Sequence, residues 1–235
     1  MEALIRTGLA QLGQAGHVPP NAPALLARYG EMLLEKNQVM NLTAITDPRD
    51  VAVLHLLDSL ALTGLVGLED RTVVDVGTGA GFPGVPLAIA RPSARVTLLD
   101  SLGKRVDFLR ESCRTLGLDN VECVHGRAEE FAGERRETFD LAVSRAVAAL
   151  PVLCELCLPL VKVGGAFWAM KSVDTEEEIS ASKTAVKVLG GRIQAVSDYT
   201  IPTTEVVHRV VCIQKTAPTP KKYPRRFALI KKQPL

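Results

Sequence analysis

The sequence predicts an α/β protein with five parallel strands, a closing antiparallel hairpin and an N-terminal helical cap over residues 1–70. The first observation is the β-branched run Thr72–Val76, which ends in a glycine-dense turn. The second is the regular alternation of strand and helix that follows, a pattern typical of parallel sheets. The third is a final pair of strands, 190–196 and 206–213, joined by a long polar segment with Pro202 that suits an antiparallel hairpin better than a parallel crossover.

The helical cap is predicted from apolar spacing. Leucines and aromatic residues recur at intervals of three and four between Leu25 and Leu33, and again from Val51 to Ala61 after Asp47 and Pro48. Asn41 falls in the loop between these two helices. It is either a turn residue that bonds its own backbone or a group that faces the site. We expect the cap to be followed by a core over 71–214 and a basic tail, the C-terminal segment, over 215–235.

The glycine-dense turn indicates a nucleotide pocket but fits two patterns. Gly79, Gly81 and Gly84 match the G-x-G-x-x-G of dinucleotide-binding folds. The stretch from Asp75 to Gly81 also reads D-x-G-x-G-x-G, the form found in methyltransferases that bind S-adenosylmethionine. That cofactor has no pyrophosphate, so it does not need a helix N-terminus aimed at phosphate. The turn alone leaves both readings open.

The later strands place further polar groups at the same edge of the predicted sheet. Asp100 ends the second strand, Arg95–Asp100. Its spacing in sequence from the glycine turn is the one at which a carboxylate accepts the ribose hydroxyls of an adenosine. Glu129 lies in the turn after the third strand, Val121–His125, within reach of an adenine edge. The fourth strand, 139–143, leads into Arg145. The fifth, 165–171, precedes the hairpin.

Five blocks, in this order, resemble the bacterial glucose-inhibited division protein B family. Those proteins are guanine-N7 methyltransferases of 16S ribosomal RNA. The resemblance covers residues 25–215, and only the glycine block is generic. The blocks are Asn41-Leu42-Thr43, 55–59, the run DVGTGAGFPGVPL at 75–87, 98–105 and Ser144-Arg145-Ala146.

The resemblance implies S-adenosylmethionine as cofactor and a class I methyltransferase fold of the Rossmann-like type. It implies cofactor contacts at Gly77, Phe82, Ala128, Glu129 and Arg145, to which we add Gly79 from the turn and Asp100 from the ribose argument. Weaker candidates for contact with RNA or the target base are Asn41, Lys104, Arg127 and Lys171.

The chemistry implied by the resemblance needs no general base, because guanine N7 carries a free lone pair in the neutral base. We therefore assign no catalytic residue. Amino methyltransferases carry an N/D-P-P-Y motif after the fourth strand, whereas this chain has Ser144-Arg145-Ala146-Val147. The difference argues against methylation of an exocyclic amine.

The C-terminal segment has seven Lys or Arg residues and no acid, so the rest of the chain is net negative against a formal total of +2. A solvated tail without function is one interpretation. The other is RNA contact, because clustered cations with interleaved aromatic rings suit phosphate neutralisation and base stacking. The candidates for this contact are Lys221, Lys222, Tyr223, Arg225 and Arg226.

Two further patterns are interpreted as structural. His55 and Asp58 are one helical turn apart, and we expect a hydrogen bond between them instead of an acid/base role. Cys154 and Cys157 lie in an apolar helical stretch and are expected to pack in the core. No histidine shows metal-ligand spacing, so no metal is assigned.

Composition is that of one globular chain, with 235 residues, 47% hydrophobic and 23% charged. No apolar run nears the roughly 18 residues that would span a membrane, and the start lacks a basic signal front. We expect a cytoplasmic monomer that acts on 16S ribosomal RNA or a small-subunit assembly particle, without membrane contact. The alternatives are a nicotinamide-dependent oxidoreductase and a non-catalytic RNA-binding module.

Overall fold

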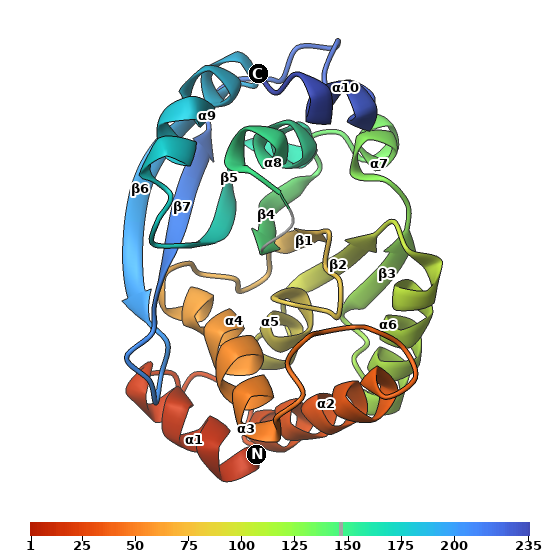
Figure 1. The fold of residues 1–235 in the computed structure, drawn as a ribbon, viewed down its shortest axis with the longest axis vertical. Coiled ribbons are helices and arrows are strands. Elements are labelled where there is room, and N and C mark those ends of the chain that lie inside the picture. The colour runs from red at the N-terminus through yellow and green to blue at the C-terminus, as the bar shows by residue number, and fades with distance from the viewer. Residues whose placement is uncertain (146–147) are drawn as a thin grey trace.

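The computed structural model describes residues 1–145 and 148–235, and its centre is a seven-stranded sheet in the order β3-β2-β1-β4-β5-β7-β6 (Figure 1). The first five strands pair in parallel, and β7 pairs antiparallel with both β5 and β6. The predicted parallel sheet with a closing hairpin is therefore confirmed. The strands are β1 (Thr72–Val76), β2 (Arg95–Asp100), β3 (Val121–His125), β4 (Phe139–Arg145), β5 (Val161–Ser172), β6 (Gly191–Thr200) and β7 (Val207–Lys215).

Helices cover both faces of the sheet, as Figure 1 shows with the cap below and α7 to α10 above. Two apolar clusters result, because successive strand residues point to opposite faces. Val73 belongs to the cluster under the cap, and its neighbour Val74 belongs to the cluster under α7 to α10. The helices are α1 (Glu2–Gln11), α2 (Ala22–Asn37), α3 (Pro48–Asp50), α4 (Asp58–Ala61), α5 (Gly84–Ala90), α6 (Gly103–Leu116), α7 (Ala128–Glu134), α8 (Leu150–Cys157), α9 (Glu176–Val188) and α10 (Phe227–Lys232).

The cap contains both predicted helical stretches and a further helix, α1. Its second stretch is not regular, because a π-helix, η1 (Val51–Leu57), lies between α3 and α4. Such wide turns often occur at functional sites. Buried Tyr29 of α2 donates a hydrogen bond to the Ala80 carbonyl at 2.5 Å. The cap therefore contacts the glycine turn directly.

Of the two interpretations of the C-terminal segment, the solvated tail does not fit the structure, since the segment packs on the domain. Lys215 completes β7, and its buried Nζ donates to the Leu158 carbonyl at 2.6 Å. Ile230 of α10 is fully buried in the cluster under α7 to α10. Cys154 and Cys157 are buried in the same cluster, as expected for core residues.

Candidate active site

The glycine turn after β1 has the backbone conformation that requires glycine. Gly77, Gly79 and Gly81 have φ values of 71°, 60° and 85°, which side chains disfavour. The amides of Gly77 and Thr78 donate to the Leu99 carbonyl at 2.9 and 3.1 Å. These bonds attach the turn to the end of β2.

Asp75 connects the end of β1 to the start of α5. Its Oδ2 accepts hydrogen bonds from Thr78 Oγ1 at 2.6 Å and from the Gly84 amide at 2.8 Å. Burial raises the pKa of this carboxyl to about 6. Asp75 lines none of the cavities described below, so its contribution is to hold the turn.

Asp100 connects the turn to the start of α6. Its Oδ2 accepts from the Gly79 amide at 2.9 Å, and its Oδ1 accepts from the Leu102 amide at 2.9 Å. Each carboxylate oxygen has two lone pairs, so both retain capacity for a ligand hydroxyl. The position agrees with the predicted ribose contact, which stays a prediction.

Two cavities meet at this turn and share Gly77, Asp100 and Ser101. The inner cavity, of about 120 Å³, is also lined by Ala128 and Glu129 after β3. The turn cavity, of about 450 Å³, contains the remaining predicted cofactor residues. All seven residues predicted for the cofactor thus line one of these cavities, with Gly79, Phe82 and Arg145 in the turn cavity.

Arg145 is held by the cap at the end of β4. Its Nη1 donates to Asp58 Oδ2 at 2.8 Å and to the Leu54 carbonyl at 3.0 Å. Its Nη2 donates to His55 Nδ1 at 3.0 Å. The guanidinium also lies 5.1 Å from the centre of the Phe82 ring. The resemblance block Ser144-Arg145-Ala146 is described only in part, because residues 146 and 147 lie outside the described ranges.

His55 is fixed on three sides. Its ring stacks on Phe82 at 4.6 Å, Nδ1 accepts from Arg145, and Nε2 donates to Thr43 Oγ1 at 2.8 Å. Burial, followed by the charge of Arg145, lowers the pKa of His55 to about 4. The ring is therefore neutral at pH 7, as acceptance from Arg145 requires.

Asp58 is fully buried and joins the cap to the hairpin. Its Oδ1 accepts from Tyr199 at 2.7 Å and from His208 at 2.9 Å, while Oδ2 accepts from Arg145. Burial opposes ionisation, but the hydrogen bond from His208 and the Arg145 charge outweigh it and lower the pKa of Asp58.

The hydrogen bond predicted between His55 and Asp58 is not formed. The two side chains bond Arg145 rather than each other; His55 lies in the π-helix and Asp58 is the first residue of α4, directly after it. Their spacing, and their place in one of the resemblance blocks, were the signals available in the sequence.

A third space, the cap cavity, adjoins the turn cavity and shares His55 and Arg145 with it. Its volume is about 710 Å³, and Met170 and Lys171 of β5 form part of its wall. Lys171 Nζ donates to the Ala148 carbonyl at 2.7 Å and pairs with Glu178. Of the candidates for base contact, Lys171 is thus the one inside a cavity next to Arg145.

The predicted RNA residues of the C-terminal segment divide into two groups. Tyr223 is only 7% exposed, and the guanidinium of Arg225 pairs with buried Glu155 at 2.6 Å, which differs from the exposed contact residues expected there. Neither is free to stack on a base or bind a phosphate in this structure. The second group, Lys221, Lys222 and Arg226, is exposed. The candidates Asn41, Lys104 and Arg127 from other parts of the chain are exposed as well.

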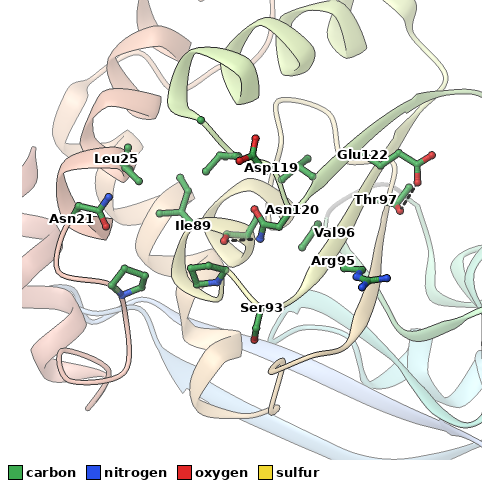
Figure 2. A pocket seen from close by; sticks show the side chains of 16 residues that line it. Asn21, Leu25, Ile89, Ser93, Arg95, Val96, Thr97, Asp119, Asn120 and Glu122 are labelled. Atoms are coloured by element: carbon green, nitrogen blue, oxygen red, sulfur yellow. Dashed lines mark hydrogen bonds between the residues drawn. The ribbon is translucent and has the colours of Figure 1, made fainter.

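Another large pocket, shown in Figure 2, lies at the opposite edge of the sheet. Arg95 and Val121, the first residues of β2 and β3, line it, and its volume is about 670 Å³. Asn120 spans its floor by donating to the carbonyls of Ala88 and Ala94. Ligands of open α/β sheets bind at the carboxyl ends of the strands, so this pocket is not the candidate active site.

No group of three or more His, Cys, Asp or Glu side chains in 1–145 and 148–235 is arranged to hold a metal ion. No helix in these ranges is long and apolar enough to cross a membrane.

Comparison with known proteins gives one consistent family. Residues 23–207 match the family model GidB, described as rRNA small subunit methyltransferase G. A relative from Alkaliphilus metalliredigens with that description is 47% identical over 99% of this chain and 98% of its own. One from Halalkalibacterium halodurans is 50% identical over 88% of both chains.

Solved structures share the fold at low identity. A methyltransferase from Aquifex aeolicus described as SAM dependent has a TM-score of 0.53 and 19% identity, over 78% of this chain and 97% of its own. The TYW2 protein of M. jannaschii, solved with AdoMet, has a TM-score of 0.53 and 18% identity, over 64% and 71%. These likenesses show the class I fold.

Proposed function

Because this chain belongs to the GidB family of small-subunit rRNA methyltransferases, we propose that it transfers a methyl group from S-adenosylmethionine to N7 of a guanine in 16S ribosomal RNA. The observation that carries the proposal is 47% identity over 99% of the chain with a relative of that description. The predicted family and the S-adenosylmethionine-dependent class of enzyme are confirmed. The oxidoreductase and the non-catalytic RNA-binding module have no support among the comparisons.

The inner and turn cavities suit S-adenosylmethionine by shape and chemistry. Gly77 and Gly79 leave room for close approach, and Asp100 has acceptor capacity for ribose hydroxyls. When bound, the cofactor supplies an electrophilic methyl group on a sulfonium. The chain's own task is to orient that group and to exclude water, and positioning of this kind is worth roughly 7 to 11 kcal/mol.

The cap cavity is our proposed entrance for the target guanine, since it meets the turn cavity at Arg145 and His55. Guanine presents two acceptors, N7 and O6, on one edge. A donor that binds O6 leaves the N7 lone pair free to attack, and Lys171 is the cation in this cavity that we propose for O6. Neutral His55 takes no proton in the step, because N7 carries none.

The remaining parts of the proposal concern the partner. We propose that the exposed cations Lys104, Arg127, Lys221, Lys222 and Arg226 contact RNA phosphates, and that Asn41, which precedes Leu42 and Thr43 of the turn cavity, also contacts RNA. We also propose a cytoplasmic monomer that acts on 16S ribosomal RNA, either free or in a small-subunit assembly particle.

The test is transfer of a labelled methyl group from S-adenosylmethionine to 16S ribosomal RNA, free and in partly assembled particles. N7-methylguanine makes the strand sensitive to reduction followed by aniline cleavage, so the position of the cut identifies the nucleotide and the atom. Gly77→Ala, which should not bind cofactor, is the matched control. Incorporation of the labelled methyl group without cleavage of the RNA strand would contradict N7 as the target. Absence of label from both substrates would contradict the activity.

A further inference from the structure

The inner cavity has a wall that comes from the far end of the chain. One side consists of the strand ends around Gly77, Asp100 and Ala128. The other side consists of Leu156 of α8 and Phe227, the first residue of α10. Figure 1 shows α10 beside α7 and above α8, on the face of the sheet opposite the cap.

The composition of this cavity distinguishes it from the turn cavity. Its polar side chains, Asp100, Ser101, Arg127 and Glu129, all come from the ends of β2 and β3 and the residues that follow them. The other side chains of the lining are apolar: Val76, Leu99, Ala128, Leu156 and Phe227. A flat heteroaromatic ring with polar atoms on one edge matches such a space, because aromatic rings gain from offset or edge-to-face packing beyond the area that they bury.

Phe227 is held in place by anchors on both sides of it in the sequence. Arg225, two residues before it, donates from its backbone amide and Nε to Glu155 Oε1, each at 2.8 Å. Glu155 is fully buried and precedes Leu156, the other apolar wall residue. Ile230, three residues after Phe227, is fully buried.

A third anchor comes from Arg136, which lies between α7 and β4. Its guanidinium donates to the carbonyls of Tyr223 at 2.8 Å and of Thr219 at 2.6 Å. The segment that carries Phe227 is therefore fixed to α8 and to the loop before β4. A wall that is positioned before the ligand arrives costs little ordering entropy on binding.

We infer that the C-terminal segment is part of the cofactor site, with the ring of Phe227 packing against the adenine of the bound cofactor. The inference rests on the proposed use of S-adenosylmethionine and names one of the residues that bind it. It also gives the segment a role distinct from RNA contact, in which buried Tyr223 and the ion-paired Arg225 act through Phe227.

The test is calorimetric titration of the full chain with S-adenosylhomocysteine and with 5′-methylthioadenosine, which lacks the amino-acid part. Phe227→Ala should weaken both ligands by about tenfold, equal to about 1.4 kcal/mol. Leu229→Ala is the matched control, because Leu229 lies on the same helix and is 42% exposed. It should leave both affinities within twofold.

Two results would overturn the inference. One is an unchanged affinity in Phe227→Ala, and the other is a loss confined to S-adenosylhomocysteine. Thermal unfolding of each variant separates a missing ring from a detached helix, and Phe227→Tyr, which keeps an aromatic ring, should restore binding to within threefold. Failure of the unaltered chain to bind S-adenosylhomocysteine would contradict the proposed function itself.

Discussion

The two ends of the chain reach the carboxyl edge of the sheet from opposite faces and act there by different means. The cap supplies a buried polar network, in which Asp58 and His55 hold the Arg145 guanidinium. The C-terminal segment supplies an apolar wall, Phe227, held by Arg225 and Arg136. A polar network fixes the direction of one charged group, whereas an apolar wall fixes the shape of a space. We therefore expect the cap to govern transfer and the C-terminal segment to govern cofactor affinity.

The largest effect is expected at the turn that both cavities share. Gly77→Ala should abolish binding of S-adenosylmethionine and leave the domain folded, because a Cβ would intrude on the ligand at a residue with φ of 71°. The backbone strain alone costs only about 1 to 2 kcal/mol. Calorimetry with thermal unfolding checks both parts, and near-unchanged affinity would remove the turn from the site.

On the cap side, Asp58→Ala should lower the free energy of unfolding by about 3 to 5 kcal/mol, because it leaves the largely buried Arg145 charge without its partner. Asp107→Asn is the control, since that carboxylate is 72% exposed and should cost almost nothing. Chemical denaturation measures both. A free energy of unfolding for Asp58→Ala equal to that of Asp107→Asn would show that the network does not support the fold.

The neutrality of His55 gives a pH test. Its pKa in the folded state is lowered to about 4 from 6.5, so the unfolded chain binds the extra proton first. The contribution of neutral His55 to the free energy of unfolding is fully present above pH 6.5. It is lost as the pH falls toward 4, which lowers the free energy of unfolding by about 3 kcal/mol. His55→Gln should lack this loss.

The comparison with the variant is needed because Asp75 acts in the opposite direction. Its pKa is raised to about 6, so its protonation relieves a penalty over part of the same range. The unaltered chain and His55→Gln are both titrated with denaturant from pH 7 to 4.5. The contribution of Asp75 cancels in the difference between their free energies of unfolding. Parallel curves would contradict the assignment for His55.

The smallest effect is expected at the exposed cations of the C-terminal segment. Changing Lys221 and Lys222 to Ala together should flatten the dependence of log RNA affinity on log salt by roughly 0.7 for each phosphate that is no longer neutralised. Affinity for S-adenosylhomocysteine should not change, because neither residue lines a cavity around the turn. RNA binding over a salt series measures the slope, and an unchanged slope would end the proposal of RNA contact there.

The sequence predicted what depends on local pattern. Alternating strands and helices, and the glycine turn with Asp100 one strand later, predict the sheet and the cofactor cavities, because parallel strands end at one edge. The partners of Arg145 were not predictable in this way. Asp58 lies 87 positions before Arg145 in the sequence, and only the packing of the cap on the sheet brings the two together.

The C-terminal segment is a second region whose contacts could not be predicted from the sequence. Its composition suggested either RNA contact or a solvated tail, but a charge count does not reveal that Glu155 is buried and needs Arg225 as its partner. The role of Phe227 depends on that pairing. Aromatic residues in a basic stretch indicate a contact, and only the fold shows what is contacted.

The most direct test of the division between the two ends is a crossed measurement on Asp58→Asn and Phe227→Ala. Each variant is assayed for S-adenosylhomocysteine affinity and for single-turnover methyl transfer at saturating cofactor. We predict that Asp58→Asn slows transfer by about a hundredfold, the cost of a small misplacement at the reacting centre, with affinity nearly unchanged. Phe227→Ala should show the reverse, a tenfold loss of affinity with nearly normal transfer at saturation. Loss of the same quantity in both variants would contradict the account.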